Sequence, residues 1–470
     1  MLHELSADVG GGHNILSTVF IEARSMYRKD GPEELKPVGE IEFVQGLAAA
    51  SASGLYGRTK VAAAIVGHAN NQRVMKLRLV ILAALLVLLA ACSQAPTPAP
   101  APSDVTPCRL KQAEQSLFSS GFPISSIRMS STGSPRVAVL FVDFPNVNAV
   151  NSTESVFSKH IPGAENYLET MSSGKLDLQF EPLHKWLRMS GELESYDQFE
   201  WLSAESQARF MQEAVDLADP DFDFSEIDSV IVIADEKALS FPSIVGFSPE
   251  PVPVISGLLP VDGNVIRNGV LRGADYGDYS AEAISHEMGH IMGLPDTYEV
   301  VDISTAYHTH VGNFGIMGQI VPMDFNRSLS DRFKGNEMLA WHRWQLGWIE
   351  DSEVFCATSS TTSIKLGPLT KNLGSRMLAM PVDSSRVLVA ENRAIDGYDQ
   401  NLSTGGILVY SVDERIATGK GPIKVQGDYS ADWPDSSVLL QPGEKITVAG
   451  YEISVTSKVG NNYFIEISTP

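Results

Sequence analysis

The chain has 470 residues, of which 43% are hydrophobic, so it is long enough for two or three domains with substantial cores. It carries 57 acidic and 35 basic residues, which gives a formal net charge of −22 at pH 7. A nucleic-acid partner is disfavoured, because phosphate contacts need basic patches. The acidity fits a soluble body outside the cytoplasm but does not indicate a substrate.

Residues 1–74 are predicted to be an upstream segment that is not part of the mature protein. They precede a signal-like sequence, and a signal peptide works from an N-terminus. Residues 8–14, 20–23 and 57–61 resemble parts of a metal-dependent amidohydrolase barrel. A hydrolase built on this segment is disfavoured, because such a barrel needs about 250 residues. A genuine N-terminal module is the alternative.

Residues 75–91 predict a lipoprotein signal peptide. Lys76 and Arg78 form a basic start, and the thirteen residues from Leu79 to Ala91 are apolar. Such a run is short for a membrane span but suits the core of a signal peptide. Leu89-Ala90-Ala91-Cys92 resembles a bacterial lipobox, and this resemblance implies cleavage before Cys92 and lipidation of its thiol. An ordinary buried helix is the alternative.

A tether is predicted for residues 92–107. Prolines at alternate positions in residues 96–102 favour an extended, semi-rigid chain that lifts the body from a membrane. The protein would then be extracytoplasmic, either a bacterial membrane lipoprotein or secreted. Apart from Cys92, the only cysteines are Cys108 and Cys356, which could pair in an exported protein or stay as two free thiols.

Residues 108–352 predict a domain of mixed helices and strands. The continuous apolar runs 137–142 and 229–234 are typical of buried strands. Further patterns predict helices over 164–171, 204–217 and 337–345 and strands over 175–180 and 186–189. Five prolines favour loops in residues 235–275. Calcium is not supported, because the aspartates at 219, 221 and 223 are followed by Phe224 where an EF-hand loop needs glycine.

The segment from His286 to Asp296 carries the strongest chemical signal. His286 and His290 are four residues apart, so on a helix their imidazoles project from one face and can share a metal ion. Glu287 can stand beside a metal-bound water as a general base without binding the metal. Gly293 can end the helix with positive φ, and the turn then returns Asp296 to the metal. Two solvated histidines are the alternative.

The helix itself is well specified. Ser280 or Asp278 can cap its start, and Gly293 can end it. Apolar residues recur at helical spacing opposite the histidines, at positions 284, 288 and 291. The pattern predicts a helix with one face in the core and the other face at the site.

This segment resembles the active-site signature of the immune inhibitor A family of secreted bacterial zinc metalloendopeptidases. The segments 312–318 and 340–348 follow in the family's order, and residues 136–145 are similar to its first core strand. The resemblance runs from about residue 108 to the C-terminus. It implies an α+β, metzincin-like zinc peptidase domain over residues 108–352, one catalytic Zn²⁺, and protein or peptide substrates.

The resemblance also implies roles for two further residues. Asp296 stands at the position of the third metal ligand, together with His286 and His290. The competitors are Glu299, Asp302, His308 and His310, and Asp296 could instead orient a ligand histidine or cap the turn. Met317, in a glycine-flanked turn, is similar to the methionine that forms an apolar floor beneath the zinc of metzincin-type peptidases.

Residues 353–470 predict an antiparallel β-sandwich. Short apolar runs at 386–390, 406–410, 445–448, 451–455 and 463–467 are separated by glycine, asparagine and aspartate. No catalytic constellation occurs there, so packing or substrate presentation is its expected role.

The predicted function is that of a lipid-anchored zinc endopeptidase that hydrolyses peptide bonds outside the cytoplasm. A non-catalytic surface lipoprotein that retains the peptidase fold is the alternative. It would predict a damaged motif, whereas His286, Glu287 and His290 are all present.

Overall fold

The computed structural model describes a large part of the chain, in two compact units, Met1–Ala99 and Pro100–Pro470. The described ranges are 18–21, 61–66, 104–112, 118–196, 204–238, 244–246, 259–273, 280–302, 306–318, 337–372, 374–400, 402–429 and 434–469. None of the helices in these ranges has the length and apolar character that a membrane crossing requires.

The first unit contains two described strands, β1 (Thr18–Ile21) and β2 (Val61–Val66), which pair in parallel. The predicted signal peptide, Cys92 and residues 92–103 of the predicted tether lie outside the described residues.

The second unit begins with a five-stranded sheet in the order β4-β3-β5-β9-β6. Every neighbouring pair is parallel except β9 and β6, which are antiparallel. The strands are β3 (Arg136–Asp143), β4 (Gln179–Arg188), β5 (Ser229–Ala234), β6 (Ile244–Gly246) and β9 (Gly269–Arg272). Two hairpins accompany the sheet, β7 (Leu259–Val261) with β8 (Asn264–Ile266) and β10 (Glu299–Asp302) with β11 (Ala306–His308).

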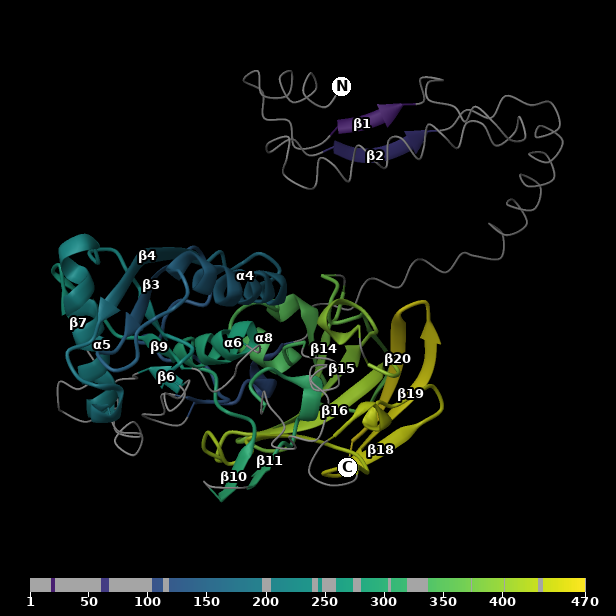
Figure 1. Cartoon of the computed structure of the whole chain (residues 1–470). Coiled ribbons are helices and arrows are strands. Elements are labelled where there is room, and N and C mark those ends of the chain that lie inside the picture. Colours follow the sequence, from purple (N-terminus) through teal and green to yellow (C-terminus); the bar gives the residue numbers. More distant parts are fainter. Residues whose placement is uncertain are drawn as a thin grey trace, which may run out of the picture. The chain divides into compact units, whose positions relative to one another are not determined.

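Helices cover both faces of this sheet (Figure 1). Alternate residues of a buried strand point to opposite sides, so each face of β3 contacts different helices. Val137, Val139 and Phe141 of β3 face the helices α4 (Thr153–Ser172) and α6 (Ser280–Ile291). Ala138, Leu140 and Val142 face α5 (Ala204–Ala218) on the other side. The expected mixture of helices and several sheets is therefore confirmed, and α6 lies with one face in the core.

Several boundaries differ from the sequence-based prediction. One strand, β4, takes the place of the two predicted over 175–180 and 186–189, and the predicted loop region 235–275 contains β6 to β9. The helix predicted to include residues 164–171 is confirmed within α4, which extends back to Thr153 through Pro162. Helix α8 (Ala340–Gln345) begins three residues later than predicted. Trp341, Trp344 and Trp348 are buried.

The C-terminal part of the unit consists of two packed sheets. One has the order β12-β14-β15-β16-β17 and the other β13-β20-β19-β18. Their strands are β12 (Val354–Cys356), β13 (Thr361–Leu366), β14 (Met377–Pro381), β15 (Arg386–Arg393), β16 (Gly406–Asp413), β17 (Ile423–Val425), β18 (Lys445–Val448), β19 (Tyr451–Val459) and β20 (Asn462–Ser468). All pairs are antiparallel except β12 with β14.

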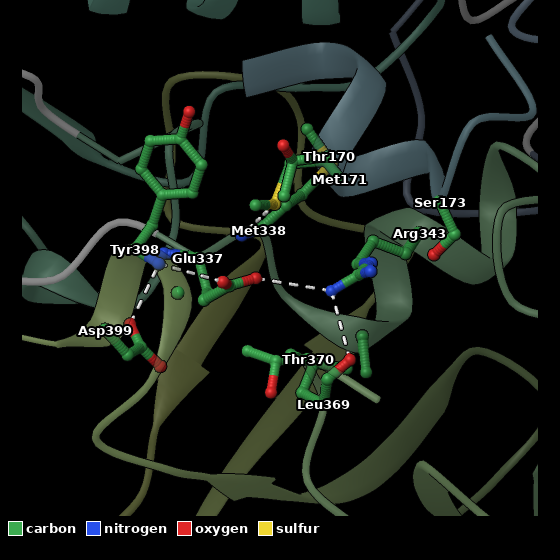
Figure 2. Close-up of polar contacts among 12 residues, drawn as sticks. Thr170, Met171, Ser173, Glu337, Met338, Arg343, Leu369, Thr370, Tyr398 and Asp399 are labelled. Atoms are coloured by element: carbon green, nitrogen blue, oxygen red, sulfur yellow. Dashed lines mark hydrogen bonds and ion pairs between the residues drawn. The ribbon is translucent and has the colours of Figure 1, made fainter. Parts of the chain in front are cut away.

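The sandwich is fastened to the rest of the unit by apolar contacts, hydrogen bonds and a covalent link. Its first sheet buries one face against the second sheet and the other against α8. Figure 2 shows Glu337, just before α8, between Arg343 at 3.3 Å and the backbone N–H of Tyr398 at 3.1 Å. Cys108 and Cys356 form a disulfide that links positions 248 residues apart.

Candidate metal centre

Helix α6 presents its histidines on the side opposite its core-facing residues. Ile284, Met288 and Ile291 are fully buried in one cluster with residues of α4 and of the sheet. His286 and His290 are 4% and 5% exposed, so the site lies in a largely dry environment. The α6 helix begins at Ser280, while the other cap candidate, Asp278, lies outside the described residues.

Three donor atoms converge at one point beside this helix. The Nε2 atoms of His286 and His290 lie 3.1 Å apart, and each is 3.1 Å from Oδ1 of Asp296. Among the described residues, these three form the group of side chains that could hold a metal ion. The structure thus brings the two histidines and the favoured third residue together.

Backbone carbonyls fix the tautomer of both imidazoles. Nδ1 of His286 donates to the carbonyl oxygen of Ile316 at 2.8 Å, and Nδ1 of His290 donates to that of Leu294 at 2.8 Å. A carbonyl oxygen only accepts, so in the neutral rings the single proton is on Nδ1 and Nε2 carries a lone pair. The carbonyls also hold the rings in place, as partners of metal-bound histidines usually do.

With this tautomer, three lone pairs point toward one another, an arrangement that a cation would stabilise. Two imidazole nitrogens and a carboxylate oxygen face one another at 3.1 Å, and neutral rings leave no proton between them. Corners of a triangle of this size lie about 1.8 Å from its centre, so a point outside the plane is about 2.0–2.1 Å from all three, the distance of zinc ligands. The residues present therefore fit a zinc ion.

A glycine turn brings Asp296 to the histidines. Gly293 has φ of +104°, a conformation that glycine adopts at little cost, and its N–H donates to His290 O as the helix ends. A Cβ at this position would lie 2.6 Å from Cγ2 of Ile124. The chain can turn back toward the metal face only because this residue has no side chain.

Asp296 is held as a carboxylate. Burial, the largest single effect, favours its neutral form, but charge on His290 and hydrogen bonds from the two histidines, which arise when a ring is protonated on Nε2 as well as on Nδ1, outweigh burial and hold the pKa of Asp296 well below its usual range. The group therefore offers a charged oxygen for a cation.

Met317 packs directly beneath the metal-facing side of α6. Its side chain is fully buried, and a Cβ on Gly289 would lie 2.5 Å from its sulfur. The carbonyl of Ile316, the preceding residue, accepts from His286, and the carbonyl of Met317 accepts from the N–H of Thr297 at 2.9 Å. This turn therefore links the helix to the segment that carries Asp296.

Glu287 follows the first histidine on α6 and is 6% exposed. It does not belong to the group of three that could hold a metal. A general base must be close to the metal site without binding the ion, and the exclusion of Glu287 from the ligand group meets the second of these conditions.

The competing candidates take other positions. His310 pairs with Glu299 at 2.9 Å, and neither joins the group of three. The hydrogen bond from His310 is the main cause that lowers the pKa of Glu299. His308 lies beside His310 with ring centroids 6.0 Å apart. The side chain of Asp302 lies outside the described part of the chain.

Sequence reasoning missed two kinds of group at this centre. One is the pair of backbone carbonyls that orient the histidines, for which no residue type is a signal. The other is Thr418, whose hydroxyl contacts Asp296 from 122 positions away along the chain.

Compared with known proteins, the chain matches no family model and no curated protein. The resemblance to the immune inhibitor A family stays a prediction from the sequence.

Proposed function

We propose that this chain is a zinc-dependent endopeptidase of the immune inhibitor A type, with a metzincin-like catalytic domain. The observation that carries the proposal is the convergence of three lone-pair donors from His286, His290 and Asp296 at 3.1 Å. Two imidazoles and one carboxylate suit zinc, and three protein ligands leave a fourth position for water or substrate.

Each residue of the site then has a distinct task. His286, His290 and Asp296 hold the ion, and the carbonyls of Ile316 and Leu294 keep the rings oriented. Zinc, when bound, polarises the scissile carbonyl and lowers the pKa of water toward ~7. Glu287 accepts the proton of the attacking water and delivers it to the leaving amine.

The position of Met317 beneath Gly289 supports the metzincin-like assignment, because a buried thioether gives the ligand helix an apolar floor. The proposed substrates are proteins or peptides outside the cytoplasm, to which the enzyme is exported as a lipoprotein anchored at Cys92. Substrates and anchor both rest on the sequence resemblances.

The test is metal analysis combined with cleavage of a mixed peptide library by the chain from residue 93 onward. One zinc per chain is expected, with cleavage that a chelator abolishes and added zinc restores. Undiminished cleavage by protein from which all metal has been removed would contradict the proposal.

A further inference from the structure

The loop between β16 and β17 of the sandwich lies against the segment that carries the third metal ligand. Gly421 N–H donates to Tyr298 O at 3.0 Å, and Lys420 pairs with Glu299 in an isolated antiparallel bridge. Gly421 has φ of +72°, and a Cβ there would lie 2.4 Å from Cδ2 of His310. The loop therefore fits closely against Tyr298, Glu299 and His310.

Thr418, in this loop, contacts both the backbone and the side chain of Asp296. Its Oγ1 accepts the backbone N–H of Asp296 at 2.9 Å and donates to Oδ2 of the same residue at 3.5 Å. A hydroxyl has one donor and two acceptor sites, so both interactions can exist together. The backbone N–H of Gly419 adds a contact to Asp296 O at 3.4 Å.

The two carboxylate oxygens of Asp296 thus have separate partners. Oδ1 faces the histidine nitrogens, while Oδ2 faces the Thr418 hydroxyl. The Thr418 hydroxyl thus fixes the backbone of Asp296 with a bond of 2.9 Å and adds a long contact to its second carboxylate oxygen, so that the first oxygen stays at the metal position. Partners of this kind typically change metal affinity or activity by ~10–100-fold when they are removed.

The loop that carries Thr418 is itself anchored on both sides. Glu414 N–H donates to Ser385 O at 2.9 Å within the sandwich, and Glu414 Oε1 accepts from the Ser119 hydroxyl at 2.7 Å. Ser119 N–H in turn donates to the carbonyl of Gly293, at the end of the ligand helix, at 3.3 Å. The position of Thr418 is therefore fixed relative to both the sandwich and α6.

We propose that Thr418 is a positioning residue for the third metal ligand, so that the C-terminal sandwich completes the metal centre rather than only packing beside it. The proposal rests on the proposed function, because it assigns Thr418 a task at the zinc site of that enzyme.

The test is a chelator-competition titration with zinc on the wild-type protein and on Thr418→Val, which keeps the shape and removes the hydroxyl. We expect the dissociation constant for zinc to rise ~10–100-fold in Thr418→Val, and Thr418→Ser to restore the wild-type value. Thr404→Val is the matched control, because its hydroxyl donates to Gly405 O in the same sandwich. Thr418→Ala removes the same hydroxyl and provides a second reading if the valine variant does not fold.

The possible outcomes separate the two proposals. Equal zinc affinity in wild type, Thr418→Val and Thr418→Ala would overturn the positioning role and leave the peptidase proposal standing. Weak binding in Thr418→Ser as well as in Thr418→Val would also overturn it, because the hydroxyl would then not be the cause. A wild-type protein that binds no zinc would overturn both proposals.

Discussion

At the scale of single residues, the candidate metal centre depends on which nitrogen of each histidine carries the proton. The carbonyls of Ile316 and Leu294 occupy the N–H groups of His286 and His290, so both remaining ring nitrogens face Asp296 as acceptors. Three acceptors in a buried site repel one another unless a cation lies among them. The same contacts that orient the three side chains therefore also favour a cation among them.

Replacement of Asp296 tests the third ligand. Asp296→Ala removes the only anionic donor of the three, so the protein should lose most of its zinc at neutral pH. Asp296→His supplies another nitrogen donor and should retain zinc in part. Zinc stoichiometry measured after dialysis checks both variants. Stoichiometric, wild-type affinity in the alanine variant would show that another residue completes the site.

The residues of the site differ in how far sequence could predict them. Asp296 was within reach, because Gly293 marks the helix end and the turn that follows is short. Thr418 was not, because its contact with Asp296 spans 122 residues and depends on how the sandwich docks. A short turn can be predicted from the residue types that form it, whereas the docking of the sandwich depends on tertiary packing that no local sequence pattern shows.

Among the elements, β3 and β5 were the most predictable, whereas β4 was predicted as two strands and β6 to β9 as loops. Strands β3 and β5 are continuous apolar runs, and β5 has the predicted bounds Ser229–Ala234. β4 is an edge strand with mostly half-buried or exposed residues and contains Pro182, so no single strand pattern runs through its sequence from end to end. In α4, Pro162 interrupts the helical pattern, because proline normally ends or kinks a helix, so the sequence predicted only the part of the helix that follows it.

Helix α4 also carries a buried histidine that makes stability depend on pH. Burial, with the nearby charges of Arg272 and Lys159, lowers the pKa of His160 to about 3. In the unfolded chain His160 has the ordinary pKa of 6.5. Between pH 6.5 and pH 3 the unfolded chain therefore binds a proton at this residue, whereas the folded protein does not. This residue should therefore contribute stability above pH 6.5 and lose it progressively as the pH falls toward 3.

The prediction is tested with His160→Leu, which cannot titrate. Between pH 7 and pH 5 the wild type should lose about 2 kcal/mol of unfolding free energy more than the variant. Denaturant midpoints of both proteins across this range measure the difference, and groups common to both cancel. Parallel pH profiles would show that His160 does not carry the effect.

In the whole molecule, the sandwich and the part of the second unit that carries the candidate metal centre are joined too firmly to act as separate modules. The Cys108–Cys356 disulfide closes a long loop, which in the chain-entropy model contributes up to ~5 kcal/mol. Arg393 of β15 donates to Phe314 O at 2.7 Å, close to the turn of Met317. The change of sequence character near residue 353 coincides with the start of β12 at Val354.

The export of the molecule is tested at Cys92, which lies outside the described residues. Cys92→Ser should prevent lipidation, leave unprocessed precursor and move the protein out of the detergent phase. Mass spectrometry of the wild type should find mature protein that lacks residues 1–74. Unchanged phase partitioning and unchanged mass in the variant would contradict the anchor, and peptides from residues 1–74 would support a genuine N-terminal module.

The proposed hydrolysis of peptide bonds with Glu287 as the base is tested by peptide-library cleavage with zinc-loaded Glu287→Gln. Glutamine keeps the size of the side chain but cannot accept the proton, so cleavage should fall by ~10²–10⁴-fold. Zinc should stay at the wild-type stoichiometry, because Glu287 is not one of the three ligands. Glu169→Gln, an exposed change on α4, should cleave as wild type does. Cleavage by Glu287→Gln within a few-fold of the wild type would show that Glu287 is not the base.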